Sequence, residues 1–196
     1  HRKKSDLDAV LKSRKSPMGR IRPNGQLALS EAGQAGSGST EFLKLLPELV
    51  GQIHRAKNNK ALADWFVNGV SKWLTTAKRA AFFVVDHEAG RIRLQAHRPA
   101  LKPILSDTLA HRALEIRTGY SWQQVGKEEC VRRLSMNAGL YVPMIFGGEE
   151  LGLLCVEDTD EGAEFSEKDL AALMVVGQLL SLAVRHHLAA EAFAAD

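Results

Sequence analysis

Cysteine and long apolar runs are both scarce in this sequence of 196 residues. The two cysteines, Cys130 and Cys155, are too few for a disulfide framework and lack the CxxC spacing of zinc and redox sites. No apolar run reaches the roughly 18 residues needed to span a bilayer, and no apolar segment follows the basic first residues. These absences predict a soluble, cytoplasmic protein without membrane contact.

Common catalytic spacings are also missing. The sequence has no phosphate-binding Gly-Lys-Ser/Thr loop, no HExxH pair and no Gly-x-Ser-x-Gly elbow. The adjacent His186 and His187 would point about 100° apart on a helix, so they do not form the i, i+4 pair that holds a metal. We therefore expect no catalytic residues, no metal and no cofactor, and the protein is predicted not to be an enzyme.

Charge divides the chain into two parts. Residues 1–22 hold eight Lys or Arg against two Asp, a net charge of +6, whereas residues 23–196 hold 18 basic against 21 acidic residues, a net charge of −3. A Gly/Ser/Ala tract follows at residues 30–40. We predict a flexible arm and linker over 1–39 and a folded domain over 40–196. The arm lacks interleaved aromatics, which favours a solvated linker over a nucleic-acid contact.

Two helices are predicted at the start of the folded domain. Phe42, Leu46, Leu49 and Ile53 recur at spacings of four, three and four, the seam of a paired helix. Pro47 fits a first helical turn best, so the regular helix is expected to begin near it. A second helix is predicted over 60–77, with Asn58 or Asn59 as its cap.

From residue 80 onward the spacing of apolar residues changes from that of helices to that of strands. Residues 80–85 are uniformly apolar like a central strand, and 91–96 alternate like its neighbour across a hairpin. A helix is expected over 105–118, with Gly119 in the C′ position, followed by a short strand at 120–125. Two further strands, 139–146 and 150–158, are joined by a turn at Gly147-Gly148-Glu149-Glu150.

The last helix is marked by its start and by its apolarity. Ser166 and Asp169 have capping-box spacing, with Phe165 placed to staple onto Leu170. Only Gln178 and Ser181 are polar between Leu170 and Val184. A helix apolar nearly all round must be buried on two sides, so we expect the sheet on one side and a second helix, from the same chain or a partner, on the other.

This order of elements resembles the GAF domain family. The strongest match is GLYVPMIFGGEELGLLCVEDTDEGAEFSEKDLAALMVVGQLLSLAV, residues 139–184, and ILSDTLAHRALEIRTGYSW is similar to GAF domains that follow forkhead-associated domains in bacterial signalling proteins. The resemblance covers about residues 42–190. It implies an α+β, GAF-like (PAS/profilin-like) fold with a central antiparallel sheet and the N- and C-terminal helices packed on one face. Glu149 and Glu150 would then occupy a solvent-facing turn without an acid/base role.

The resemblance also implies a ligand pocket between the sheet and the segments around the middle helix, residues 97–140. Its signatures for known ligands are absent: Cys130 is followed by Val131-Arg132 rather than by the histidine of bilin-binding members. The Asn-Lys-x-Phe-Asp signature of cyclic-nucleotide members is missing too, which leaves cyclic-nucleotide binding open but unsupported. The residues expected to line the pocket are Phe83, His97, Thr108, His111, Trp122 and Tyr141.

Three functions follow from the resemblance. The first is a regulatory, small-molecule-sensing GAF domain of a multidomain cytoplasmic signalling protein, which transmits its ligand state through the terminal helices to an output domain. The second is a degenerate domain, filled by Trp122, Met136 and Tyr141, that serves only dimerisation or protein interaction. The third is a GAF-type methionine sulfoxide reductase, against which the small number of cysteines argues. We adopt the first.

Assembly and core are predicted from the same apolar positions. We expect a homodimer through the terminal helices, since an apolar face left in water would associate. In the alternative, these helices cover each other within one chain. The expected interface residues are Leu49, Ile53, Leu173, Leu180 and Val184, and the expected core residues are Phe82, Val84, Leu94, Leu154, Leu173 and Leu180.

Overall fold

A computed structural model describes residues 19–23, 37–99, 107–124 and 136–195. Six antiparallel strands form one sheet in the order β1-β4-β5-β6-β2-β3. The helices are α2 (Ser37–Arg55), α3 (Asn59–Gly69), the short 3-10 helix η2 (Val70–Lys72), α4 (Asp107–Ile116) and α6 (Glu167–Ala195). The strands are β1 (Gly19–Pro23), β2 (Arg79–Asp86), β3 (Arg91–Arg98), β4 (Tyr120–Gln124), β5 (Ala138–Phe146) and β6 (Glu149–Asp158).

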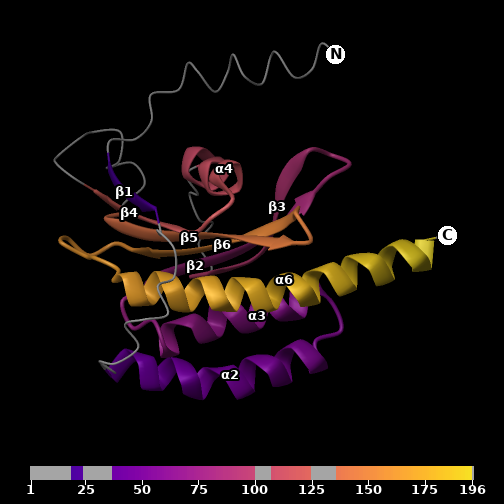
Figure 1. The fold of residues 1–196 in the computed structure, drawn as a ribbon, viewed down its shortest axis with the longest axis horizontal. Coiled ribbons are helices and arrows are strands. Elements are labelled where there is room, and N and C mark those ends of the chain that lie inside the picture. The colour runs from indigo at the N-terminus through magenta and orange to yellow at the C-terminus, as the bar shows by residue number, and fades with distance from the viewer. Residues whose placement is uncertain (1–18, 24–36, 100–106, 125–135, 196) are drawn as a thin grey trace, which may run out of the picture.

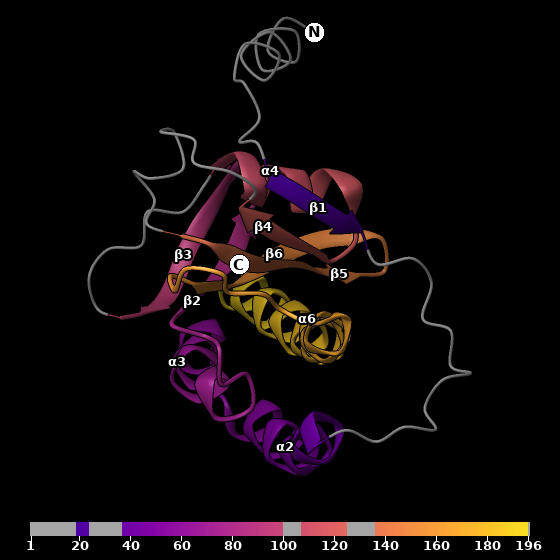
Figure 2. The ribbon, with the colours of Figure 1, turned by 90° about the vertical axis from the view of Figure 1, so that its left-hand side faces the viewer.

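The helices are divided between the two faces of the sheet. Helix α6 lies directly on one face, with α3 beside it and α2 outermost, and α4 lies on the opposite face (Figures 1 and 2). The predicted α+β architecture, with N- and C-terminal helices on one face, is therefore confirmed. The predicted hairpin turn is confirmed as well, because Gly147 and Gly148 have φ of 58° and 85°, values that glycine adopts readily.

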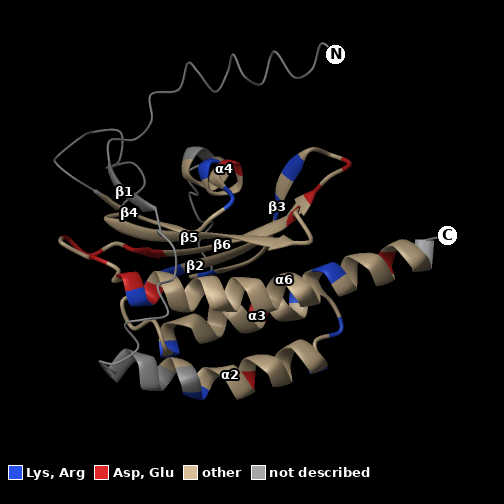
Figure 3. Ribbon diagram, in the orientation of Figure 1, with Lys and Arg blue, Asp and Glu red and all other residues tan. Residues whose placement is uncertain are grey.

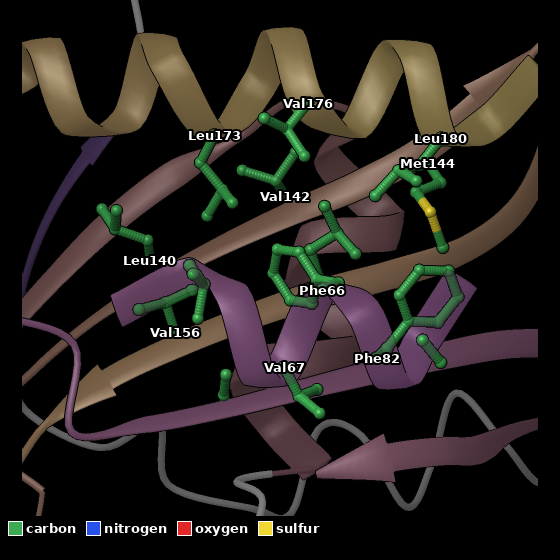
Figure 4. Close-up of a cluster of buried hydrophobic side chains, with 14 of the residues drawn as sticks. Phe66, Val67, Phe82, Leu140, Val142, Met144, Val156, Leu173, Val176 and Leu180 are labelled. Atoms are coloured by element: carbon green, nitrogen blue, oxygen red, sulfur yellow. The ribbon is translucent and has the colours of Figure 1, made fainter. Parts of the chain in front are cut away.

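An aliphatic core fills the space between the sheet and the three helices, and we call it the helix-face core. Figure 4 shows Leu173, Val176 and Leu180 of α6 pointing toward the sheet. Five of the six predicted core residues are buried in this core: Phe82, Val84, Leu154, Leu173 and Leu180.

Leu94 is the exception among the predicted core residues, since it is 36% exposed. A bulge in the pairing of β2 with β3 places Ala96 opposite Phe82 but Leu94 opposite Phe83. The bulge moves Leu94 to the α4 side of the sheet, on the edge strand β3, where little covers it. A strict alternation of apolar residues does not reveal such an inserted residue.

Helix α2 begins ten residues before the predicted start. It runs from Ser37 to Arg55 with Pro47 inside it, so the expectation of a start near Pro47 is wrong. Leu45 and Leu49, on either side of Pro47, are both buried in the helix-face core. Their burial favours a continuous helix despite the backbone hydrogen bond that proline cannot donate.

Strand β1 lies within the stretch that was predicted to be an arm. Gly19 to Pro23 pair antiparallel with β4, from Gln124 to Tyr120, and form an edge of the sheet. The prediction of a flexible arm over 1–39 is therefore wrong for these five residues. Composition fails here because strand pairing is made by backbone groups, which the apolar content of a segment does not report.

Two predicted helix caps are confirmed and one is wrong. The Asn58 side chain accepts from the backbone of Ala61 at 2.9 Å, and Ser166 and Asp169 form the reciprocal capping box at the start of α6. The left-handed residue after α4 is Arg117, with φ of 56°, rather than Gly119. Gly119 serves packing instead, because a Cβ there would lie 2.8 Å from Cγ of Met174 in α6.

Candidate functional site

A second buried cluster lies between the sheet and α4, where the family resemblance placed a pocket; we call it the α4-face cluster. Three of the predicted pocket residues, Phe83, Trp122 and Tyr141, meet in it although they come from β2, β4 and β5. Its members are Ala81, Phe83, Leu109, Ala110, Ala113, Tyr120, Trp122, Met136, Tyr141, Leu153 and Cys155.

The other three predicted pocket residues lie around this cluster. His97 is paired with Ala81 and so shares its face, and the ring Nδ1 of His97 lies 2.9 Å from the carbonyl oxygen of Pro99. His111 is exposed on α4 and is not part of the buried cluster. Thr108 begins the first turn of α4, but its side chain lies outside the described part of the structure.

Four residues form a row across the sheet on the α4 side. Trp122 is paired with Gly139, Gly139 with Glu157, and Glu157 with Arg79, on β4, β5, β6 and β2 respectively. Gly139 leaves room in this row for the ring of Tyr141, since a Cβ there would lie 2.8 Å from Cε2 of that ring. The sheet thus brings an indole N–H, a carboxyl group and a guanidinium group onto one line.

Glu157 is the buried carboxyl of the row. The Tyr141 hydroxyl donates to its Oε1 at 3.0 Å, and Nη1 of Arg79 lies 4.0 Å from its Oε2. Burial raises the pKa of Glu157, while the hydrogen bond from Tyr141 and the charge of Arg79 act in the opposite direction. The net shift favours the protonated form compared with an exposed glutamate.

Burial also controls the neighbouring weak acids. It raises the pKa of the Tyr141 hydroxyl, and the charges of Glu157 and Cys155 add to this rise. The pKa of the Cys155 thiol is raised by burial and by Glu157. Because the thiolate is the reactive form of cysteine, Cys155 is held in an unreactive state. It packs as a small apolar side chain, which agrees with its place in an apolar run.

Trp122 carries the clearest unmet hydrogen-bonding group of the cluster. Its Nε1–H is buried and has no acceptor among the described residues. An unsatisfied buried donor costs about 1–3 kcal/mol, so an isolated one in a packed domain calls for an explanation. Tyr120 differs, because its hydroxyl donates to the carbonyl of Leu109 and its ring stacks on that of Tyr141 at a centroid distance of 5.4 Å.

Sequence reasoning missed Glu157 and Arg79 as members of the site. Both stand at the end of an apolar strand, where a charged residue is normally read as the start of a loop. A usable signal existed in the alternation of β6, since Cys155 and Glu157 are two residues apart and must share a face. Pairing with Arg79 could not be foreseen, because it depends on the order of strands.

The carboxylates of the β5–β6 hairpin connect two helices. Glu150 lies 3.2 Å from Nη1 of Arg117, which follows α4 and also donates to the carbonyl of Gly148. Glu149 lies 3.6 Å from Nη1 of Arg185 in α6 and 3.5 Å from Nε2 of His87. The two carboxylates thus have cationic partners. They belong to β6 and are half-buried, so the prediction that they occupy a solvent-facing turn is wrong, because the turn itself consists of Gly147 and Gly148.

The residues predicted to form a dimer interface lie inside one chain. Leu49, Leu173, Leu180 and Val184 are fully buried in the helix-face core, and Ile53 packs against it. The four fully buried residues cannot offer a surface to a partner, so the assignment is wrong for them, whereas Ile53 is only partly buried. The terminal helices instead cover each other and the sheet, which is the alternative that the sequence left open. A sequence seam shows that a helix is paired but not with which helix.

The described ranges contain no group of three or more His, Cys, Asp or Glu that would hold a metal ion. Among these same residues no helix is long and apolar enough to cross a bilayer.

Solved structures similar to this one come from several bacterial proteins. The GAF domain of a phosphoenolpyruvate-protein phosphotransferase from Coxiella burnetii has a TM-score of 0.64 at 19% identity, covering 79% of this chain and 98% of that one. A GAF domain of a putative sensor histidine kinase from Pseudomonas syringae pv. tomato has 0.61 at 13%, covering 80% and 95%. The free methionine-R-sulfoxide reductase of Neisseria meningitidis has 0.64 at 14%, covering 81% and 96%. At these identities the likeness is one of fold.

Comparison of sequences identifies the family. A search of curated protein sequences returned no significant match. The model of the GAF domain family matches residues 72–184, which is more than half of the chain. The matched range includes α4 and strands β2 to β6, which enclose the α4-face cluster. The chain belongs to the GAF domain family.

Proposed function

We propose that this chain is a regulatory GAF domain of a cytoplasmic signalling protein and that it binds a small molecule between the sheet and α4. Its fold is shared with GAF domains of sensor kinases. The observation that carries the proposal is the buried Nε1–H of Trp122, which has no acceptor among the described residues. A ligand acceptor would satisfy this donor and recover the free energy that its burial costs.

The polar row suits a ligand with both donors and acceptors. Trp122 supplies a donor, Glu157 supplies a carboxyl group, and Arg79 supplies a cation beside it. The surrounding side chains are aromatic or aliphatic, the usual lining of a site in which a few polar groups orient a small molecule. We assign no catalytic step to this site, because Cys155 is buried as a thiol and is not positioned as a nucleophile.

The β5–β6 hairpin gives a route from the site to α6. Arg117, directly after α4, contacts Gly148 and Glu150, while Glu149 of the same hairpin contacts Arg185 of α6. Gly119 packs closely under Met174 of α6. A shift of α4 on ligand binding would therefore act on α6 at two places, through ion pairs and through a tight contact.

The exposed side of α6 is the surface that we propose for homodimer formation and output. Val175, Leu182 and Phe193 are exposed at 36%, 53% and 84%, and their spacings of seven and eleven residues place them on one face. Figure 3 shows charges at the start of α6 and in its last third, with none on the turns between. This replaces the buried residues first predicted for the interface.

A self-filled domain is the second candidate. Its support is the dense packing of the α4-face cluster: Tyr141 is fully buried, its ring stacks on that of Tyr120, and its hydroxyl oxygen lies 3.2 Å from the sulfur of Met136. In this case the domain serves only as a dimerisation or interaction module. The two candidates differ in one measurable property, namely whether any small molecule stabilises the fold through Trp122.

Thermal unfolding of the whole chain with a panel of nucleotides and metabolites tests the proposal. A ligand at about 100 times its dissociation constant should add roughly 2.7 kcal/mol to the free energy of unfolding. Trp122→Phe removes the N–H and should weaken binding, while Trp65→Phe removes an indole that already donates to Glu48 and should not. Equal binding by the two variants, or no stabilising compound at all, would favour the self-filled domain.

Sedimentation velocity at micromolar concentration tests the dimer. We expect a dimer for the parent chain and a monomer for Leu182→Glu, because this leucine is exposed and its substitution leaves the core intact. Glu191→Lys, at an exposed position nine residues after Leu182 and therefore on the opposite side of α6, is the charge-changing control. A monomeric parent chain would remove the proposed role of α6 as a dimer contact.

A further inference from the structure

A cavity of about 190 Å³ lies on the helix side of the sheet, away from the α4-face cluster. It is bounded by the end of α3, by η2, and by the ends of β2 and β3 that adjoin them. The lining residues are Val67, Val70, Ser71, Ala77, Lys78, Arg79, Ala80 and Arg98. None of them belongs to the buried α4-face cluster, and Arg79 is the one lining residue that also belongs to the polar row of the proposed sensor site.

The pleat of β2 decides which charged residues face the cavity. Ala80 belongs to the helix-face core and is paired with Arg98, so the Arg98 side chain lies on that face. Lys78 directly precedes β2 and lines the cavity as well. Arg79 alternates to the other side of β2 and lies beside Glu157, although it also borders the cavity. Lys78 and Arg98 are therefore the cations that are assigned to the cavity alone.

Hydrogen bonds hold Arg98 at the cavity wall. Its Nη1 donates to the carbonyl of Asn68 at 3.4 Å and to Oγ of Ser71 at 3.3 Å. Because the Ser71 oxygen accepts this bond, its own hydroxyl hydrogen is directed elsewhere and is suited to donate to an acceptor in the cavity. Arginine, serine and lysine side chains thus present donors to one small space.

The balance of charge at the cavity is positive. Lys78 is paired with Asp160 at 3.4 Å, and both side chains are largely exposed, so this pair is weak and solvent-screened. The hydrogen bonds of Arg98 to Asn68 and Ser71 are made to carbonyl and hydroxyl oxygens rather than to a carboxylate. The apolar residues Val67, Val70, Ala77 and Ala80 supply the remaining wall, and an anion next to such a wall is less well screened than one in water.

The volume limits what can enter. About 190 Å³ corresponds to roughly six waters at about 30 Å³ each, and it lies below the roughly 300 Å³ at which pockets for drug-sized ligands begin. A phosphate group fits this space and matches three donors that come from different directions. A guanidinium group can bind either a phosphate or a carboxylate through two parallel hydrogen bonds. A small carboxylate then has fewer oxygens left than a phosphate to accept from the other donors of the cavity.

We infer that this cavity binds a phosphate group, either as inorganic phosphate or as the terminal group of a small phosphorylated metabolite, with Arg98, Lys78 and Ser71 as donors. The assignment is independent of the proposed sensor function, since it concerns the opposite side of the sheet. A bound phosphate would tie the end of α3 and η2 to strands β2 and β3, and so would stabilise the contact of this helix with the sheet.

Calorimetric titration and thermal unfolding with inorganic phosphate test the inference. At matched ionic strength, phosphate should give saturable binding and raise the melting temperature, whereas sodium chloride and acetate should not. Arg98→Gln should weaken phosphate binding by about tenfold or more, which corresponds to about 1.4 kcal/mol. Arg93→Gln, an exposed arginine of the same strand outside the cavity, should bind as the parent does.

A second variant distinguishes phosphate binding by Arg98 from a purely structural role of this residue. Ser71→Ala keeps the arginine and removes one donor, so it should also weaken binding while leaving the fold intact. Titration with glycerol 3-phosphate distinguishes inorganic phosphate from a phosphorylated metabolite as the source of the group. Tighter binding of the ester than of inorganic phosphate would favour the metabolite. Equal phosphate binding by Arg98→Gln and Arg93→Gln, or no saturable binding by the parent, would overturn the assignment.

Discussion

The two faces of the sheet are covered by different kinds of side chain. The helix face is covered by α2, α3 and α6, and its core is filled by Leu, Val, Phe and Ala together with Met144. The polar side chains buried on these helices have hydrogen-bond partners: His187 lies 3.1 Å from Oδ1 of Asn59, and Ser181 donates to the carbonyl of Gln178 at 2.7 Å. The α4 face carries stacked tyrosines, a buried tryptophan N–H, a buried carboxyl at Glu157 and a thiol at Cys155.

This difference bears on stability and on the proposed binding of a ligand. Aliphatic side chains without polar atoms pack closely and contribute through buried area alone, so the helix face is suited to hold the fold together. Buried polar groups cost free energy unless they find partners, and the α4 face therefore depends on hydrogen bonds and on any ligand that completes them. The same sheet can thus be rigid on one side and responsive on the other.

The largest effect is expected from emptying part of the helix face. Leu154→Ala should cost about 2–5 kcal/mol, because Leu154 is fully buried between the sheet and α6. Urea unfolding measures the change, and Val50→Ala, at a position of α2 that is 56% exposed, is the matched control with an expected cost below about 0.5 kcal/mol. A loss under 1 kcal/mol at Leu154 would contradict the close packing of this face.

A pair of helix glycines tests how closely α6 lies on the sheet. A Cβ at Gly177 would come within 2.8 Å of Cγ1 of Val142, whereas at Gly51 it would meet only the end of the flexible Arg55 side chain, at 3.2 Å. Gly177→Ala should destabilise the protein by about 1–3 kcal/mol. Gly51→Ala should stabilise it by up to about 1 kcal/mol through helix propensity. A stabilising Gly177→Ala would show that α6 packs more loosely.

The buried carboxyl on the α4 face should make stability depend on pH. Because the pKa of Glu157 is raised on folding, its contribution is complete below the usual value of 4.5 and is lost as pH rises through the folded value. Glu157→Gln removes this loss and should gain stability relative to the parent, by about 1.4 kcal/mol for each pKa unit of the shift.

Denaturant unfolding at a series of pH values from 4 to 8 measures this gain. The exposed Glu161→Gln serves as the control and should run parallel to the parent over the whole range. If the parent instead became more stable than Glu157→Gln with rising pH, the ion pair with Arg79 and the hydrogen bond from Tyr141 would outweigh burial.

The smallest effect is expected at the β1 edge of the sheet. Deletion of residues 1–23 removes β1 and its pairing with β4. The backbone hydrogen bonds that are lost contribute about 0.5–1.5 kcal/mol each, but ordering the strand costs about 1–2 kcal/mol for each residue. These opposing contributions nearly cancel, so the melting temperature should fall by only a few degrees. A large drop would show that β1 is an essential part of the domain.

Most of the secondary structure could be predicted because it depends on local patterns. The apolar run of β2, the double-glycine turn before β6 and the capping box of α6 each combine a period with a start or stop signal. The errors occur where two local signals conflict or where an extra residue interrupts the period. Pro47 did not start α2, and the bulge in the pairing of β2 with β3 placed Leu94 on the unexpected face.

The site was predicted only in part because its members come from distant strands. Phe83, Trp122 and Tyr141 were expected in a pocket and do meet, since the resemblance to the family supplied the topology. Glu157 and Arg79 were not expected, because their role follows from being neighbours across β6 and β2. Burial of Leu180 inside one chain rather than between two was likewise beyond a helical period.

The sequence by itself determined the elements other than β1, their order and the resemblance to the family, because periodicity, caps and turn residues act over short distances along the chain. Only the tertiary structure decided which side chains share a face, which helix covers which, and which polar groups are left without partners. The physical reason is that burial and hydrogen-bond satisfaction depend on strand order and register. Two residues far apart in sequence, such as Trp122 and Glu157, lie in one row only after the sheet has formed.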